Sequence, residues 1–280
     1  MGVNRRDFLK VLGGTCVSLA AGSRSDASQK NKNDVEFYGI LYDSTRCVAC
    51  QSCEYACAEQ NNLPEPDESV EAGVIRKTNE TRATAISIFN TSKGEVPVKR
   101  QCMHCNDPAC ASACLTRAMY KTYEAPVIWR EDKCMGCRFC MVSCPFDSPK
   151  FEYQSTNPRI IKCTMCFDLI KDGGVPACVD SCPAEAIVFG TRRELIKEAR
   201  RRIFEDPDSY FDHIYGEHEA GGTGWLYLSP VPFEEIGFNA NIQKSSYPAL
   251  TKGFISSIAP VDIFLPALLL GIYEATKFKK

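Results

Sequence analysis

The sequence predicts an α+β fold made of two small cysteine-rich modules, one inserted in the other, with a β insertion and a C-terminal transmembrane helix. Three observations predict it: cysteines recur in four regularly spaced sets, short β-rich runs flank these sets, and an apolar segment lies near the C-terminus. With 280 residues, 44% hydrophobic and 24% charged, the chain is neither disordered nor a polytopic membrane protein. Its net charge of -2 gives no reason to expect nucleic-acid binding.

The N-terminus has the layout of a twin-arginine signal peptide over residues 1–27. Arg5 and Arg6 stand in an R-R-x-F-L-K frame, and the uncharged stretch 11–22 follows. An ordinary secretory signal or a buried helix is the alternative. We expect cleavage after Ala27, removal of Cys16 with the signal, and export of the folded body to the periplasm.

Apart from Cys16, the 17 cysteines form four sets of four. The first set is Cys47, Cys50, Cys53 and Cys57, and the second is Cys102, Cys105, Cys110 and Cys114. The third set is Cys134, Cys137, Cys140 and Cys144, and the fourth is Cys163, Cys166, Cys178 and Cys182. The first and third follow C-x2-C-x2-C-x3-C, while the other two have a longer middle gap. A loop with this spacing curls around one [4Fe-4S] cubane, and its fourth cysteine points toward a second cluster.

Three other uses of cysteine explain this pattern less well. A disulfide framework is common in exported proteins but does not account for four such spacings. A zinc ribbon needs two pairs rather than three or four close cysteines, and covalent haem needs C-x-x-C-H, which the sequence lacks. We therefore expect four [4Fe-4S] clusters with the sixteen cysteines as iron ligands. We expect His104, inside the second set, to lie behind the ligands.

Short β-rich runs organise the sets into modules. Runs 119–123 and 127–130 make a hairpin between the second and third sets, which is how a two-cluster ferredoxin joins its halves. Residues 102–150 are therefore the predicted inner module. The outer module, also ferredoxin-like, comprises residues 36–57 plus 160–190, with strands expected at 37–42 and 186–189; the whole cluster domain covers 34–204.

The ligand sets follow from the two-cluster ferredoxin pattern, in which the fourth cysteine of each set ligates the cluster of the other set. One cluster is assigned to Cys134, Cys137, Cys140 and Cys114, and its neighbour to Cys102, Cys105, Cys110 and Cys144. The outer module assigns one cluster to Cys47, Cys50, Cys53 and Cys182, and the other to Cys163, Cys166, Cys178 and Cys57. The alternative is that each set closes on its own cluster.

Two further segments complete the body. Residues 58–101 read as a β insertion packed over the clusters, with strands at 84–89 and 96–100. A capping box at Thr191 opens a basic amphipathic helix to about Ile203, which is either a solvated surface helix or a partner-docking helix.

The C-terminal third is predicted to lead from the body to a membrane. Residues 205–250 read as an extended docking arm with one strand at 225–228, and 251–276 as a transmembrane anchor. Pro260 and Pro266 interrupt helical hydrogen bonding, so an interfacial helix is the alternative. The lysines after the segment place the tail in the cytoplasm and the body outside, on the periplasmic face.

Basic residues next to the cysteine sets are candidates for tuning the clusters. Four cubanes would take the formal charge from -2 to roughly -10. The candidates are Arg46, Arg100, Arg117, Lys133, Arg138 and Lys162. Each either raises the potential of a facing cluster or is a solvated surface charge.

The order of the four sets resembles the iron-sulfur subunit of dimethyl-sulfoxide-reductase-type complexes. Three motifs carry the resemblance: 41–46 (L-Y-D-S-T-R), 101–105 (Q-C-M-H-C) and 221–223 (G-G-T). Within that family the signal peptide and single anchor are most similar to the iron-sulfur subunit of periplasmic uptake hydrogenases, and next to the formate dehydrogenase beta subunit. The chain departs from the family at Leu115, where a proline often follows the set, and in its anchor, which contains two prolines and Asp262.

The resemblance implies a non-catalytic electron-transfer subunit of anaerobic respiration. It would relay electrons between a catalytic subunit, hydrogenase-like or a molybdopterin oxidoreductase, and a quinone-reactive integral membrane subunit. An alternative relay connects a multihaem cytochrome c with the quinone pool. An enzyme in its own right would need a cluster with an open iron, hence a set lacking a cysteine, and no set lacks one. Reversible reduction would distinguish a relay from a protein that holds clusters passively.

Overall fold

The computed structural model describes residues 37–66 and 69–277, which contain both helices and strands. The predicted signal peptide, its twin arginines and Cys16 lie outside the described residues. The strands are β1 (Tyr38–Asp43), β2 (Ala85–Thr91), β3 (Gly94–Arg100), β4 (Met119–Lys121), β5 (Val127–Trp129), β6 (Lys150–Phe151), β7 (Ile160–Ile161), β8 (Ile187–Thr191) and β9 (Trp225–Leu228). The helices are α2 (Ser52–Gln60), α3 (Ala109–Ser112), α4 (Phe139–Val142), α5 (Phe167–Lys171), α6 (Ala177–Asp180), α7 (Arg192–Glu205) and α8 (Tyr247–Thr276), with 3-10 turns η1 (Glu131–Lys133) and η2 (Glu219–Gly221).

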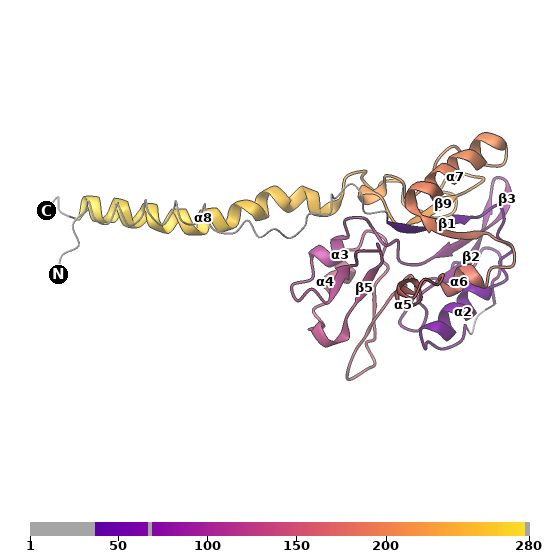
Figure 1. Cartoon of the computed structure of the whole chain (residues 1–280), viewed down its shortest axis with the longest axis horizontal. Coiled ribbons are helices and arrows are strands. Elements are labelled where there is room, and N and C mark those ends of the chain that lie inside the picture. Colours follow the sequence, from indigo (N-terminus) through magenta and orange to yellow (C-terminus); the bar gives the residue numbers. More distant parts are fainter. Residues whose placement is uncertain (1–36, 67–68, 278–280) are drawn as a thin grey trace. The chain divides into compact units, whose positions relative to one another are not determined.

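A three-stranded sheet in the order β8-β1-β9 forms the centre of the body (Figure 1). Strand β1 pairs antiparallel with β8 and parallel with β9. The expected pairing of the strands at 37–42 and 186–189 is therefore observed. Because side chains alternate along a strand, Leu41 and its partner Leu226 pack with α7, while Ile40 and Tyr42 pack with the cysteine-rich layer.

The extended arm predicted for 205–250 is wrong over most of its length. Strand β9 is part of the central sheet, and Trp225 and Leu226 are completely buried. Tyr215 stacks against Phe233 and Phe238, with ring centroids 5.1 and 4.6 Å apart. The glycines, prolines and aromatic residues that suggested an arm instead build a core, because the aromatic rings bury large apolar surfaces against one another.

One predicted hairpin and the two predicted strands of the insertion form as expected. Strands β2 and β3 pair antiparallel across a two-residue turn, so the β insertion contains the strands that the sequence indicates. Strands β4 and β5 pair antiparallel between the second and third cysteine sets. Two short strands, β6 and β7, form another antiparallel pair that the sequence did not indicate.

Helix α7 begins at the predicted capping box and covers one face of the central sheet (Figure 1). The Thr191 hydroxyl accepts a hydrogen bond from the Glu194 N–H and donates one to the Glu194 carboxylate. Leu195 and Ala199 are buried against the sheet. The basic residues of α7 are largely paired within the chain, since Arg200 binds Glu217 and Arg201 binds carboxylates on its own helix.

Helix α8 is the one described helix that is long and apolar enough to cross a membrane, judged by length and composition. It begins at Tyr247, four residues before the predicted anchor, and runs through both prolines to Thr276. Its 30 residues would span about 45 Å. Each proline removes one backbone hydrogen bond but does not end the helix. The two prolines therefore do not shorten the helix.

Candidate metal centres

The sixteen described cysteines are all free thiols, and each set passes from a loop into a short helix. Residues in the left-handed conformation occur in every loop: Gln51, His104, Arg138 and Met165 are examples, one from each set. Such backbone is rare for residues other than glycine and turns the chain sharply. The turns also aim backbone N–H groups at sulfur, as Met119 N does toward Cys114 Sγ at 3.3 Å and Met165 N toward Cys163 Sγ at 3.3 Å.

The folded chain brings together cysteines from different sets. Burial and the nearby thiols of Cys134, Cys114 and Cys137 raise the pKa of Cys140 to about 11. Burial and the thiols of Cys102, Cys144 and Cys110 raise the pKa of Cys105 well above its usual value. Each neighbourhood thus combines three cysteines of one set with the fourth cysteine of another.

The same exchange occurs between the first and fourth sets. Burial, and then the thiols of Cys163, Cys178 and Cys166, raise the pKa of Cys57. The thiol of Cys182 acts on Cys47, and one cavity is lined by Cys47, Cys50, Cys53 and Cys182. Helix α2, which carries Cys53 and Cys57, is in contact with helix α6, which carries Cys178.

Four groups of thiols result, and they are named here in spatial order. Group A contains Cys47, Cys50, Cys53 and Cys182; group B contains Cys163, Cys166, Cys178 and Cys57. Group C contains Cys102, Cys105, Cys110 and Cys144; group D contains Cys134, Cys137, Cys140 and Cys114. Adjacent groups are linked by pairs of cysteines in which one thiol influences the pKa of the other. Cys53 and Cys178 link A to B, Cys163 and Cys102 link B to C, and Cys110 and Cys140 link C to D.

Burial differs along this row. All four thiols of group B are buried, whereas Cys50 of group A and Cys137 of group D are exposed. Large apolar side chains are exposed beside the end groups, including Val48 next to group A and Met135 and Phe139 next to group D. Each end of the row therefore has an exposed cysteine, whereas the cysteines of groups B and C are buried or half-buried.

The donor chemistry fits iron-sulfur clusters. Four thiols per group match the thiolate ligation of a [4Fe-4S] cubane. Within residues 37–66 and 69–277, no three Cys, His, Asp or Glu side chains converge on a single metal ion. Burial raises the pKa of the Cys53 thiol and that of the Cys110 thiol, so metal binding has to displace the protons of these two thiols.

The structure places the basic residues that were predicted to tune the clusters in different environments. Lys162 is buried, and its Nζ donates to the backbone oxygens of Val127 and Cys163 at 2.5 and 2.6 Å. Arg100 stacks between Phe89 and Phe238 and donates to the Ile236 carbonyl. Arg46 forms an ion pair with Asp43. Arg138 stacks against the rings of Phe151 and Tyr153. In the described part of the chain, no side-chain hydrogen bond joins Arg117, Lys133 or Arg138 to a cysteine sulfur.

Sequence reasoning missed two other lysines near the thiols. Lys99 on β3 is 1% exposed, and Lys121 on β4 donates to the backbone oxygens of His104 and Cys105. Burial lowers the pKa of Lys121 to about 8, although the Cys105 thiol opposes this. No pattern in the sequence indicated them, because a lysine on a strand is ordinarily read as a solvent-facing residue.

His104 is completely buried, and its Nδ1 accepts a hydrogen bond from the Val127 N–H at 2.9 Å. Burial and the nearby Lys162 and Lys121 hold its pKa well below the usual value. The neutral imidazole therefore ties the loop of the second set to strand β5, behind the thiols of group C.

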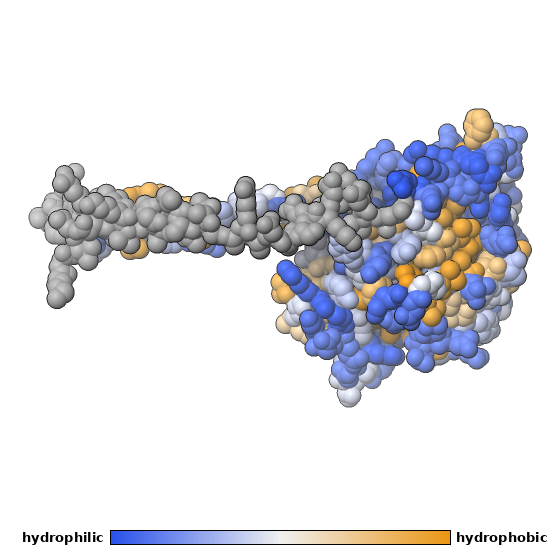
Figure 2. Space-filling model, in the orientation of Figure 1, coloured by the Kyte–Doolittle hydropathy of each residue, from blue (hydrophilic) through white to orange (hydrophobic). Residues whose placement is uncertain are grey.

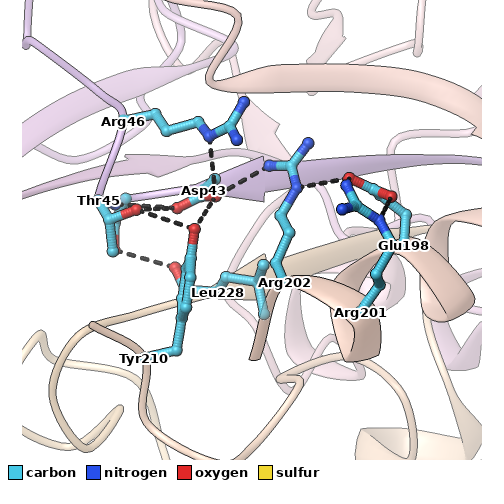
Figure 3. A network of polar contacts seen from close by, with 9 residues as sticks. Asp43, Thr45, Arg46, Glu198, Arg201, Arg202, Tyr210 and Leu228 are labelled. Carbon is cyan, nitrogen blue, oxygen red and sulfur yellow. Dashed lines mark hydrogen bonds and ion pairs between the residues drawn. The ribbon is translucent and has the colours of Figure 1, made fainter. Parts of the chain in front are cut away.

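A buried polar network fixes the loop that leads into the first set (Figure 3). The Asp43 carboxylate accepts hydrogen bonds from Arg202 Nη1 and Tyr210 Oη, both at 2.9 Å, and from the Thr45 hydroxyl at 2.6 Å. Arg202 also binds Glu198 on α7. The motif at 41–46 thus connects β1 to α7 immediately before Cys47.

Comparison with known proteins gives one consistent picture. Residues 96–192 match the model of the 4Fe-4S dicluster domain. A protein of Nitratidesulfovibrio vulgaris is 42% identical over 289 residues, covering 99% of this chain and 78% of the relative. The hydrogenase-2 operon protein HybA of Escherichia coli O157:H7 is 35% identical, covering 84% of this chain and 83% of the relative. The iron-sulfur subunit of the nitrate-inducible formate dehydrogenase of E. coli K12 is 30% identical, covering 67% and 66%.

Proposed function

Because the chain belongs to the family of [4Fe-4S] iron-sulfur subunits of hydrogenase and formate dehydrogenase type, we propose that it is an electron relay carrying four clusters, one in each of groups A to D. Bound [4Fe-4S] clusters supply one-electron carriers. The observation that carries the proposal is the row of four thiol groups with exposed ends. The chain contributes the thiolates, the spacing between the sites and the exclusion of water from the interior of the row.

We propose as iron ligands the sixteen cysteines as they are gathered in the four groups, with the fourth cysteine of every set serving another set's cluster. The proposed arrangement is an inner module (102–150) within an outer module (36–57 plus 160–190). Three contacts support it: the β4–β5 hairpin between the second and third sets, the β1–β8 pairing outside the first and fourth sets, and the contact of α2 with α6.

Paired cysteine substitutions test the ligand sets by iron content. Cys57→Ser with Cys163→Ser removes two ligands from group B, so the chain should lose one cluster. Cys57→Ser with Cys47→Ser removes ligands from groups B and A, so it should lose two. If each set closed on its own cluster, the two results would be exchanged. Anaerobic iron and sulfide analysis of the purified full chain distinguishes the two outcomes.

The exposed ends of the row are the proposed electron ports. Group D is next to α3, which is in contact with α8, and the Ser246 hydroxyl at the start of α8 donates to Asp107 at 2.6 Å. Because α8 fits a membrane anchor, we propose that group D serves a quinone-reactive membrane subunit. Group A would then serve the catalytic redox subunit. Apolar surface on the visible face of the body, bordered by hydrophilic residues, is consistent with docking to partner subunits (Figure 2).

We further propose that the twin-arginine route exports the body to the periplasmic face of the cytoplasmic membrane. The R-R-x-F-L-K frame and the lysines after α8 support this topology. Changing Arg5 and Arg6 to lysine should block export, and cell fractionation would measure it. Unchanged periplasmic delivery of this variant would contradict the route.

A further inference from the structure

Lys99 is a buried charge at the junction of groups A and B. Its side chain is 1% exposed, and on the β2–β3 hairpin it stands opposite Ile86. Ile86 also lines the cavity of group A and belongs to the same buried cluster as Cys53 and Cys178. Lys99 therefore lies where the two groups meet, far from water.

Among the described residues, the side-chain hydrogen-bond partners of the Lys99 ammonium group are both neutral. Its Nζ donates to the Thr84 hydroxyl and, at 3.2 Å, to Gln101 Oε1. The Trp225 ring lies 4.8 Å away, on the side where its π face favours a cation. In the part of the chain that the structure describes, no carboxylate forms an ion pair with Lys99.

The nearby carboxylate is already engaged elsewhere. Glu54 follows Cys53, is 2% exposed, and is bound by both terminal nitrogens of Arg76 at 2.5 and 3.0 Å. It also accepts a hydrogen bond from the Ile86 N–H. The charges of Glu54 and Arg76 offset each other, so the charge of Lys99 has to be balanced by something else.

As thiolates, the cysteines of both groups would supply a negative field at Lys99. Burial acts to lower the pKa of Lys99, but the fields of Cys178, Cys53, Cys163 and Cys57 outweigh it and raise the pKa. Removing an isolated ion from water is unfavourable unless an opposite charge compensates it. Two thiolate-ligated clusters on either side of the ammonium group would provide that charge.

We propose that Lys99 is the positive counter-charge shared by the clusters of groups A and B, and that it raises the reduction potentials of these two clusters. The proposal rests on the proposed ligand sets. Each cluster gains one electron and hence one negative charge on reduction, so a fixed neighbouring cation stabilises the reduced form more than the oxidised form.

A redox titration of the cluster-loaded full chain tests the proposal, with dithionite and mediators supplying the electrons and EPR spectroscopy following each cluster. Lys99→Met removes the charge. Gln101→Glu keeps the lysine and places a carboxylate beside it in a side chain of nearly the same shape. Each variant should lower the midpoint potentials of two of the four clusters by about 59 mV. For a one-electron couple, this shift is about a tenfold change in the ratio of oxidised to reduced cluster at a given potential. The exposed Lys197, changed to Met, is the matched control and should leave all midpoints unchanged.

The outcomes separate the two proposals. A wild-type chain that loads fewer than four clusters contradicts the proposed function itself. Four clusters in the wild type with unchanged midpoints in Lys99→Met and Gln101→Glu, or with an equal shift of all four, overturns the role of Lys99. If the Lys99→Met chain does not load clusters, the midpoint potentials of the Gln101→Glu chain decide. If neither loads, Lys99→Arg decides: restored loading supports the need for charge, and failed loading shows a purely structural role.

Discussion

At the scale of single residues, a buried charged side chain in this chain is stabilised by a neighbouring side chain of opposite charge. Glu54 and Arg76 form a bidentate pair with side chains only 1% exposed, next to Cys53. The pair also holds strand β2, because Glu54 accepts from the Ile86 N–H and Arg76 donates to the Ile86 carbonyl. It therefore connects the helix of the first cysteine set to the β insertion.

Glu54→Gln should destabilise the fold, by about 3–5 kcal/mol, because it leaves the Arg76 charge buried without its partner. The measurement is the urea concentration at which the anaerobic, cluster-loaded chain loses its visible absorbance. Glu54→Gln combined with Arg76→Met should recover much of the loss, since both charges are then absent. Arg201→Met, which breaks exposed pairs with Glu198 and Glu205, is the control and should change the urea midpoint little, because water screens these charges. Equal effects of the buried and exposed changes would contradict the prediction.

The pair of His213 and Glu219 gives the fold a pH dependence. The Glu219 hydrogen bond, at 2.8 Å, raises the pKa of His213. Burial acts to raise the pKa of Glu219, but hydrogen bonds from His213 and the Gly216 N–H lower it overall. A raised histidine pKa gives stability that is complete below the unfolded value of about 6.5 and is lost as the pH rises through the folded value. A lowered carboxyl pKa gives stability that is lost as the pH falls through its own folded value.

At pH 5.5 the wild type should therefore be more stable than His213→Gln. The difference in the free energy of unfolding should be about 1 kcal/mol or less, because the histidine is partly exposed, and it should shrink by pH 8.5. Comparing the two urea midpoints at both pH values measures it, and the other titrating groups cancel in the difference. A difference of the same size at both pH values would show that His213 acts only through packing.

At the scale of elements, tertiary contacts modify local rules. Helix α8 contains two prolines yet stays helical over 30 residues, and Pro248 stands at its start, where a missing N–H costs no hydrogen bond. Its large apolar side chains, among them Phe254, Ile263 and Leu270, are all exposed. A helix with so much exposed apolar surface needs an apolar environment to cover it.

A chain that ends at Ser246 should leave the membrane fraction while keeping the iron content of the full chain. The truncation removes all of α8, whereas the sheets and the sixteen thiols stay intact. Carbonate washing of membranes from cells lacking partner subunits, followed by immunoblotting and iron analysis, measures both properties. If the shortened chain stayed with the membranes as firmly as the full chain, α8 would not be the anchor.

At the scale of the whole molecule, the proposed ligand sets would couple cluster assembly to folding. Each thiol group draws on two cysteine sets that are distant in sequence, so no group can form from one segment alone. Thiols held together by burial carry raised pKa values, and ligation has to release their protons. The proposed export in the folded state would therefore require the clusters to be loaded beforehand.

The anaerobically purified chain should contain about 16 irons and as many sulfides, from four cubanes. Mediators should reduce it reversibly, and it should turn over neither hydrogen nor formate without a partner subunit, since every proposed iron is fully ligated. Metal and sulfide analysis with a mediated titration measures this. A fully loaded sample with half the iron, or one that turned over substrate alone, would contradict the proposal.

The sequence by itself determined the features that depend on local spacing. Four iron-sulfur motifs, the hairpin after the second set, the strands of the β insertion and the cap of α7 at Thr191 all follow from residues a few positions apart. Short-range geometry is enough in these cases, because a turn, a cap or a ligand loop is completed by its own neighbours.

Only the tertiary structure decided the features that depend on distant partners. The aromatic stretch after α7 became core, since β9 pairs in parallel with β1 and nothing local indicates a parallel partner. Lys99 became buried because the chain folds Trp225 and two thiol groups around it, although its strand position suggests solvent. The physical reason is the same in both cases: burial is a property of the assembled surroundings, and a residue's own neighbours in sequence do not contain that information.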